Sequence, residues 1–155
     1  MKLSRTLSYA LRATLELAEL DSTSPTPCSR LAARGGMPAR FLLQVLRHLV
    51  AHDILRSSRG VDGGYALKRA PSEISLLEVI EAIDGPLAAS LAAGDILPEP
   101  TRVRLETLLK EVTERAREDL GAVTLADLLA DRHPVASRRD PPPHSHAAVK
   151  GKADL

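Results

Sequence analysis

The chain has 155 residues, of which 44% are apolar, 26% charged and 2% aromatic, so it can bury the core of one domain but offers few rings for stacking on single-stranded bases. Its single cysteine, Cys28, excludes a disulfide framework and any site built from several thiolates of one chain, and no run of about 18 apolar residues predicts a membrane span. The charges divide unevenly: residues 1–70 hold 11 basic and 5 acidic side chains, residues 71–131 hold 5 and 13, and residues 132–155 hold 5 and 2. A basic amino-terminal unit beside an acidic one predicts that the first unit faces a polyanion; the alternative is a chance difference between solvated surfaces.

Three helices are predicted in the first third of the chain. Ser4 is a good N-cap for a helix over about residues 5–20, in which apolar side chains repeat at helical spacing. Ser29 is expected to cap a short helix over residues 30–34, which a Gly-Gly pair ends. A third helix is predicted over residues 38–52, with a proline in its first turn and with Leu42, Val45, Leu46 and Leu49 facing inward.

A two-stranded ribbon is predicted next. Residues 54–57 and 65–68 are expected as short strands, and the Asp-Gly pair between them fits a hairpin turn. Ser75 then caps a further helix that ends at an Asp-Gly-Pro sequence. The order helix, short helix, tight turn, helix and ribbon is that of a winged helix-turn-helix fold, which is mainly α with a small β wing.

The rest of the chain is expected to serve assembly. Residues 1–85 form the predicted DNA-binding unit, and residues 86–100 are loop-like. Residues 101–131 are predicted as a long helix and a short one, the short one with Thr124 as its N-cap. The apolar stripe of the long helix exceeds what the small core can cover, which favours dimerisation. Residues 132–155 are rich in Pro, His and Lys and poor in large apolar residues, which predicts a disordered tail.

The third helix carries the candidate DNA-reading residues. Arg and Gln side chains match guanine and adenine edges in the major groove, and an apolar side chain can contact a thymine methyl group. On this basis the outer face of the helix is predicted to bind DNA through Ala39, Arg40, Leu43, Gln44 and Arg47. The alternative is an ordinary solvated helix face.

The predicted wing supplies a second set of candidates. Arg59 precedes Gly60, and the glycines of the tip allow a close approach to DNA, so Arg59 is suited to the narrow minor groove. Arg56, Lys68 and Arg69 are expected to contact phosphates or to remain solvated.

The residues give little support for metal binding, a reactive thiol or catalysis. His48 and His52 lie one helical turn apart, but no further ligand completes a metal site on that face. Cys28 precedes a predicted helix, which can lower the pKa of a thiol, although no activating base lies nearby in the sequence. No nucleophile–base spacing indicates catalysis, so neither an enzyme nor a bound metal is expected.

The sequence resembles the Rrf2 family of bacterial transcription regulators over residues 1–131. The resemblance rests on several strings in one order: Met1-Lys2-Leu3-Ser4, Tyr9-Ala10-Leu11-Arg12, Phe41-Leu42-Leu43-Gln44-Val45-Leu46, Ser57-Ser58-Arg59-Gly60 followed by Gly63-Gly64-Tyr65, Leu76-Leu77-Glu78-Val79-Ile80-Glu81-Ala82-Ile83-Asp84-Gly85-Pro86, and Val123-Thr124-Leu125-Ala126-Asp127-Leu128-Leu129. It implies a homodimer whose third helix enters the major groove, whose wing reaches the minor groove and whose long helix crosses that of its partner.

The sequence departs from the family in the residues that bind the cofactor. Many relatives hold an iron–sulfur cluster through cysteines between the fourth helix and the long helix, and some add an acidic ligand from the first helix. Here residues 87–100 contain neither Cys nor His, and Ser8 takes the place of the acidic ligand. Because clusters are held mainly by thiolates, no cofactor is expected. The signal is then an unknown small molecule or protein effector, or there is none.

Two functions remain open from the sequence. The first is a cytoplasmic, homodimeric regulator that binds a pseudo-palindromic site in double-stranded DNA. The alternative is a winged-helix dimer that binds a protein or a metabolite and has lost DNA readout. The first requires Arg40, Gln44, Arg47 and Arg59 to share one exposed surface.

Overall fold

The computed structural model describes residues 4–20, 24–89 and 97–132, and within them the predicted mainly helical fold with a two-stranded sheet is confirmed. The elements in chain order are α1 (Arg5–Glu19), α2 (Cys28–Gly35), α3 (Ala39–Ala51), β1 (Leu55–Ser58), β2 (Gly64–Leu67), the 3-10 turn η1 (Pro71–Glu73), α4 (Leu76–Asp84), α5 (Glu99–Ala122) and α6 (Leu125–Arg132). Of the tail predicted over residues 132–155, Arg132 is the last residue of α6, and residues 133–155 lie outside the described residues. None of the described helices is long and apolar enough to cross a membrane.

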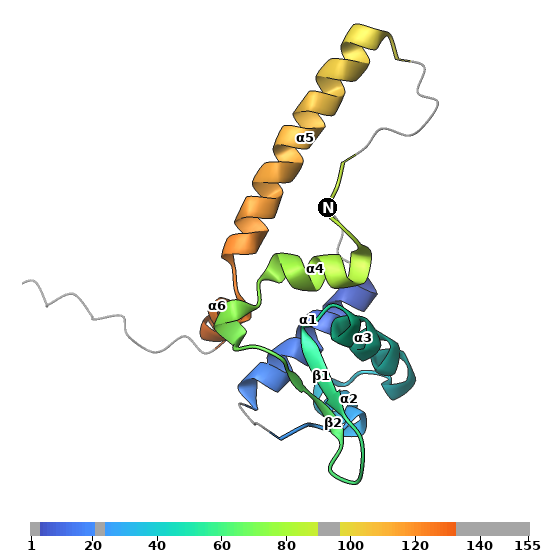
Figure 1. Ribbon diagram of the computed structural model, residues 1–155, viewed down its shortest axis with the longest axis vertical. Helices are drawn as coiled ribbons and strands as arrows, with labels where there is room; N and C mark the ends of the chain where they lie inside the picture. Colours follow the sequence, from blue (N-terminus) through green and yellow to red (C-terminus); the bar gives the residue numbers. More distant parts are fainter. Residues whose placement is uncertain (1–3, 21–23, 90–96, 133–155) are drawn as a thin grey trace, which may run out of the picture.

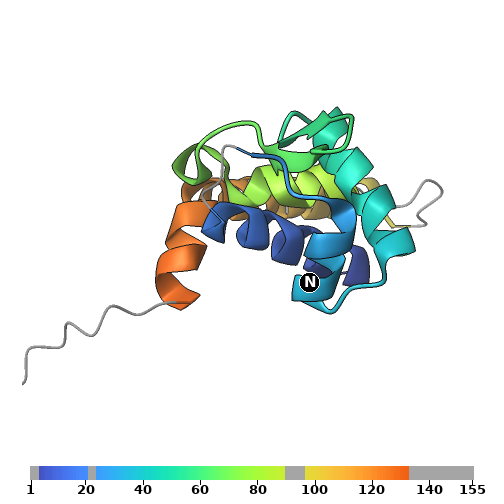
Figure 2. The ribbon, with the colours of Figure 1, turned by 90° about the horizontal axis from the view of Figure 1, so that it is seen from below.

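The helices form a body from which α5 projects. Figure 1 shows α4 lying across the foot of α5, with β1 and β2 at the opposite end of the molecule. Viewed from below, α1 runs through the middle of the body, with α6 at one side and α3 at the other (Figure 2). The wing and the long helix therefore extend from opposite ends of one body.

One apolar core holds this body together. α1 contacts α2, α3, α4 and α6, so it is the central element of the packing. The side chains that are at most 1% exposed include Leu7, Leu31, Leu42, Val45, Leu46, Leu49, Ile54, Ile74, Val79 and Leu125. The predicted inward face of α3 is confirmed by four of them, and burying such side chains contributes about 1.5–3 kcal/mol each.

Three predicted helix caps are confirmed. The backbone N–H of Leu7 donates to Ser4 Oγ at 3.0 Å, and Ser75 Oγ accepts from the backbone N–H of Glu78 at 3.2 Å. At α6, Thr124 Oγ1 accepts from the backbone N–H of Asp127 at 3.2 Å. Each hydroxyl satisfies a donor that the first turn of its helix leaves unpaired.

The starts of the other helices differ from prediction because prolines occupy them. α2 begins at Cys28 with Pro27 as its N-cap, so the prediction that Ser29 caps it is wrong. α3 likewise begins after Pro38, and α5 begins at Glu99, two residues before the predicted start. Proline fixes φ near the helical value and lacks the N–H that a first turn leaves unpaired, which suits it to these positions.

The wing is a short antiparallel hairpin. Ser58 pairs with Gly64, and the bounds of each strand lie one residue from those predicted, later in the chain for β1 and earlier for β2. The positive φ of the connecting loop falls on Gly60 (108°), and the N–H of Gly63 donates to the Gly60 carbonyl at 3.0 Å. The predicted hairpin turn is confirmed, and it contains the Asp62-Gly63 pair, but the residue with positive φ is Gly60 and not Asp62.

Two isolated β-bridges, not predicted from the sequence, join segments that are distant in the chain. The buried Thr26 donates its N–H to the carbonyl of Tyr65 at 2.8 Å and accepts from the Tyr65 N–H at 2.9 Å. Ser75 and Thr124 form the other bridge, which ties the start of α4 to the junction of α5 and α6. The wing is thus anchored to the body on one side, and α4 is anchored to α5 on the other.

Candidate nucleic-acid interface

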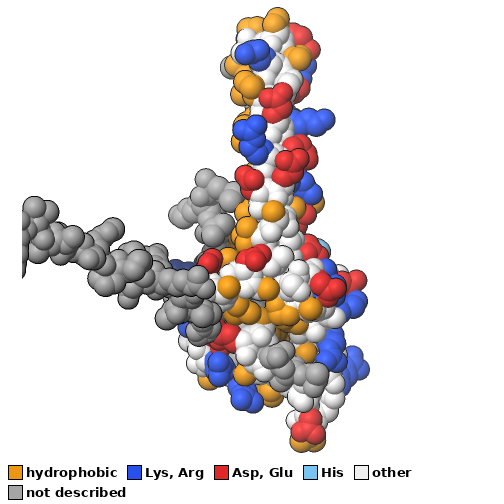
Figure 3. Space-filling view, turned by 90° about the vertical axis from the view of Figure 1, so that its left-hand side faces the viewer, with side chains coloured by type: hydrophobic (Ala, Val, Ile, Leu, Met, Phe, Trp, Pro, Cys, Tyr) orange, Lys and Arg blue, Asp and Glu red, His pale blue; other side chains and the backbone are white. Residues whose placement is uncertain are grey.

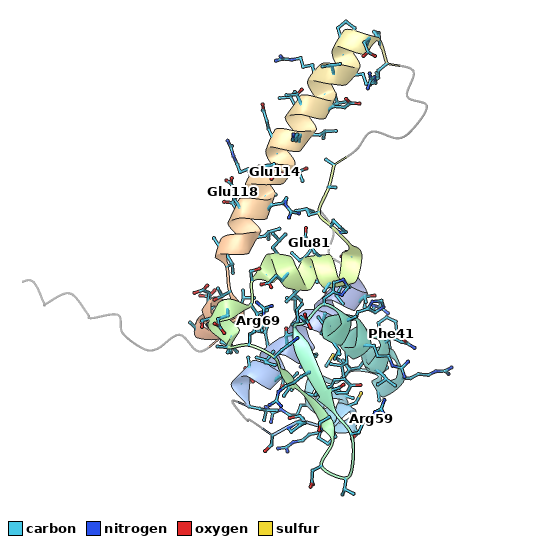
Figure 4. All side chains as sticks on the ribbon, viewed as in Figure 1. Phe41, Arg59, Arg69, Glu81, Glu114 and Glu118 are labelled. Carbon is cyan, nitrogen blue, oxygen red and sulfur yellow. The ribbon has the colours of Figure 1, made fainter. Side chains whose placement is uncertain are left out.

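The outer face of α3 carries the five predicted residues in one row. Because the opposite face is buried, side chains three and four residues apart point away from the body together. Leu43 is partly buried, whereas the other four are exposed: Ala39, Arg40, Gln44 and Arg47. Phe41 lies beside this row and packs edge-on against Tyr9 of α1, with ring centroids 5.5 Å apart, which fixes the amino-terminal end of α3 (Figure 4).

A hollow of about 430 Å³ joins α3 to the wing. Its lining comes from both elements: Arg47, Val50, Ser57, Ser58, Arg59, Gly64 and Tyr65. Arg59 lies on the wing, which extends below α3 in the view of Figure 4. The structure therefore brings Arg47 and Arg59, predicted from two separate motifs, onto one surface, together with three residues that carry hydroxyl groups.

Two basic residues that follow the wing, Lys68 and Arg69, bond to carboxylates. Lys68 pairs with Asp53 and holds the pKa of that carboxyl below its usual value. Arg69 donates to Glu78 at 2.7 Å and to the Glu73 carbonyl at 2.7 Å (Figure 4). Both side chains, predicted as phosphate contacts or solvated charges, thus act within the fold.

Glu78 is the acceptor at the centre of this arrangement. Partial burial raises the pKa of Glu78, but hydrogen bonds from Ser75 and Arg69 outweigh it and hold the pKa below its ordinary value. Glu78 Oε2 accepts from the backbone N–H of Ser75 at 2.8 Å. A carboxylate at the first turn of α4 also interacts favourably with the helix dipole.

The remaining candidate ligands form no site in the described part of the chain. Partial burial raises the pKa of the Cys28 thiol, so the predicted tendency to titrate low is wrong. His52 Nδ1 lies 2.9 Å from the carbonyl oxygen of His48, within its own helix. No group of three or more His, Cys, Asp or Glu side chains that could hold a metal gathers among the described residues.

A helix-turn-helix with an exposed basic second helix and a wing beside it is a DNA-binding winged-helix regulator of transcription. The chain belongs to the Rrf2 family, whose family model, described as an iron-dependent transcriptional regulator, matches residues 3–131.

Relatives and solved structures agree with this assignment. The chain is 35% identical over 130 residues to a candidate HTH-type transcriptional regulator of Mycobacterium tuberculosis, covering 83% of this chain and 81% of that protein. It is 29% identical over 143 residues to the HTH-type transcriptional regulator IscR of Sodalis glossinidius, covering 90% and 87%. The structure of CymR, the global cysteine regulator of B. subtilis, matches with a TM-score of 0.70 and 27% identity, covering 84% of this chain and 98% of that one.

The donor set of this chain does not fit an iron–sulfur cluster. Such clusters need several thiolates, and the whole sequence supplies one, Cys28, which is partly buried on α2. Between α4 and α5, residues 85–98 contain neither Cys nor His. The description of the family as iron-dependent therefore finds no matching ligands in these residues.

Proposed function

We propose that this protein is a cytoplasmic, homodimeric regulator that recognises a pseudo-palindromic site in double-stranded DNA and holds no iron–sulfur cluster. The observation that carries the proposal is the shared surface of Arg47 and Arg59. A helix face and a wing that reach DNA together can read two grooves from one side of the duplex.

In this proposal α3 lies in the major groove. The exposed Arg40, Gln44 and Arg47 present forked donors and acceptors to base edges, which supplies sequence preference. Ala39 and the accessible part of Leu43 provide apolar contact with thymine methyl groups. Because α3 is fixed from behind by its buried face, the reading side chains start from a rigid support.

The wing enters the adjacent minor groove. Arg59 has no carboxylate partner among the described residues, unlike Lys68 and Arg69, so its charge is available to the narrow and electronegative groove. Gly60 bends the chain directly after Arg59 through its positive φ.

The proposed dimer forms through α5. Among the described residues, no α5 side chain is buried, and the apolar Leu108 and Val112, one helical turn apart on the same face, are 45% and 67% exposed. Figure 3 shows apolar side chains along the projecting helix among charged ones. A second copy packed on α5 would cover the stripe and place two α3 helices about one turn of DNA apart.

Selection of bound fragments from a random duplex pool, followed by gel shifts at low and moderate salt, tests the proposal. The wild type should enrich a pseudo-palindromic sequence, and Arg59→Ala should weaken binding to it about tenfold, as expected for loss of a groove contact. Lys110→Ala is the matched control because it removes a cation from α5, on the far side of α4 from the wing, and should bind like the wild type.

Two results would contradict the proposal. Binding without any enriched sequence, lost at moderate salt, would show only nonspecific attraction to phosphates. Absence of DNA binding under both conditions would favour the alternative of a protein- or metabolite-binding dimer.

A further inference from the structure

The far end of the wing is a tight turn with two side chains at its corner. The hydrogen bond from the Gly63 N–H to the Gly60 carbonyl, at 3.0 Å, closes a four-residue turn and places Val61 and Asp62 at its two central positions. Val61 is 101% exposed and Asp62 is exposed. Figure 3 shows an acidic and an apolar group together at the lower end of the molecule, where the wing ends.

The carboxylate of Asp62 is not used within the described structure. It forms no ion pair or hydrogen bond with the described residues, whereas the acidic side chains near the root of the wing, Asp53 and Glu78, bond to Lys68 and Arg69. Asp62 also does not pair with the nearby Arg59 in this part of the chain. The tip of the wing, which belongs to a basic DNA-binding unit, therefore carries a negative charge that no described residue neutralises.

The base edges in the minor groove determine which donors can form a hydrogen bond with such a carboxylate. A·T pairs present only acceptors there, and guanine adds one donor, its N2 amino group. Runs of A·T pairs also narrow the groove and deepen its negative potential, which repels a carboxylate. Opposite a guanine, the same carboxylate gains a charge-assisted hydrogen bond.

We propose that Asp62 is a specificity-determining residue of the wing, which accepts a hydrogen bond from a guanine N2 amino group in the minor groove beside Arg59. This inference rests on the proposed function and adds to it a choice of base pair. The wing selects a G·C pair at its contact, while Arg59 supplies the electrostatic attraction that brings the tip into the groove.

Inosine provides a direct test, because an inosine·cytosine pair lacks the N2 amino group and leaves the major-groove edge of the pair unchanged. A duplex selected by the wild type from a random pool is synthesised again with each guanine outside the α3 contacts replaced singly by inosine. Affinities of the wild type and of Asp62→Ala for each duplex form a double-mutant cycle. Glu118→Gln, which removes an exposed carboxylate from α5, is the control for charge alone (Figure 4).

One inosine substitution should weaken wild-type and Glu118→Gln binding about tenfold and leave Asp62→Ala binding within about twofold. Equal effects of inosine on the wild type and Asp62→Ala at every position would overturn this inference alone. A uniform rise in the affinity of Asp62→Ala for all duplexes would also overturn it, because the carboxylate would then only repel phosphates. If the wild type binds no duplex, the proposed function fails and this inference fails with it.

Discussion

The backbone of Thr26 occupies the space that a side chain on Gly64 would need. A Cβ atom on Gly64 would come within 2.4 Å of the carbonyl carbon of Thr26, closer than real Cβ atoms approach any atom. The contact exists because Thr26 and Tyr65, the neighbour of Gly64, exchange two backbone hydrogen bonds. The wing can therefore stay joined to the segment before α2 only while residue 64 has no side chain.

Gly64→Ala should lower the free energy of unfolding by about 1–3 kcal/mol, because the overpacked contact is with backbone that cannot rotate away. Urea unfolding followed by circular dichroism measures the effect. Gly121→Ala is the control: its nearest neighbour is Leu77 Cδ2 at 3.8 Å, so alanine should raise stability by about 0.5–1 kcal/mol. Equal stabilities of wild type and Gly64→Ala would show that the bridge at Thr26 is not maintained.

The first two helices are joined by a second relationship that can be tested. Arg34 of α2 donates to the buried Glu16 of α1 at 2.8 Å, and the Glu16 side chain is 6% exposed. Arg34→Met should cost about 1–3 kcal/mol, because the buried carboxylate loses a charge-assisted hydrogen bond. Arg30→Met on the exposed side of α2 should change stability by less than about 0.5 kcal/mol.

A double variant separates the pair from general effects of charge. Glu16→Gln combined with Arg34→Met should cost less than the two single changes together, as expected for residues in contact. Additive costs in urea unfolding would mean that the pair contributes nothing specific to the packing of α1 on α2.

The depressed pKa of Glu78 predicts a dependence of stability on pH. A carboxyl whose pKa is lower in the folded state than in the unfolded state stabilises the fold above its unfolded pKa, about 4.3, and this contribution is lost as the pH falls through the folded pKa. Between about pH 5 and pH 3 the wild type should therefore lose more stability than Glu78→Gln, in which glutamine keeps the cap but carries no charge. Parallel unfolding free energies of the two proteins over this range would contradict the prediction.

The exposed apolar stripe of α5 predicts that a substitution within it gives a variant that folds but stays monomeric. Val112 is 67% exposed, so Val112→Asp should leave the helical content unchanged while preventing a second copy from covering the stripe. Analytical ultracentrifugation should show a dimer for the wild type and a monomer for the variant. Glu118→Lys, also on α5, should remain dimeric; monomers for all three proteins would refute the role given to α5.

Local interactions explain why much of the fold could be predicted from the sequence. The caps at Ser4, Ser75 and Thr124 depend on residues three positions away, and the buried face of α3 follows from helical spacing. The bridge at Thr26 could not be predicted, because it joins segments that are distant in the sequence and carries no residue pattern.

The candidate site was predictable in part for the same reason. The outward row on α3 follows from spacing within one helix, and Arg59 follows from the glycines of the wing. That Arg47 and Arg59 line one hollow depends on how the wing folds against α3, which only the tertiary structure shows. The ion pairs of Lys68 and Arg69 with carboxylates could not be predicted for the same reason, since Glu78, the partner of Arg69, lies on a different element.

These internal ion pairs have a consequence for the salt dependence of DNA binding. Counterion release follows the number of cations that actually meet phosphates, and Arg34, Lys68 and Arg69 already contact carboxylates of their own chain. The affinity of this protein for DNA should therefore fall less steeply with ionic strength than the 11 basic residues of its first 70 positions suggest. A larger share of its binding free energy is then left to contacts that depend on base sequence.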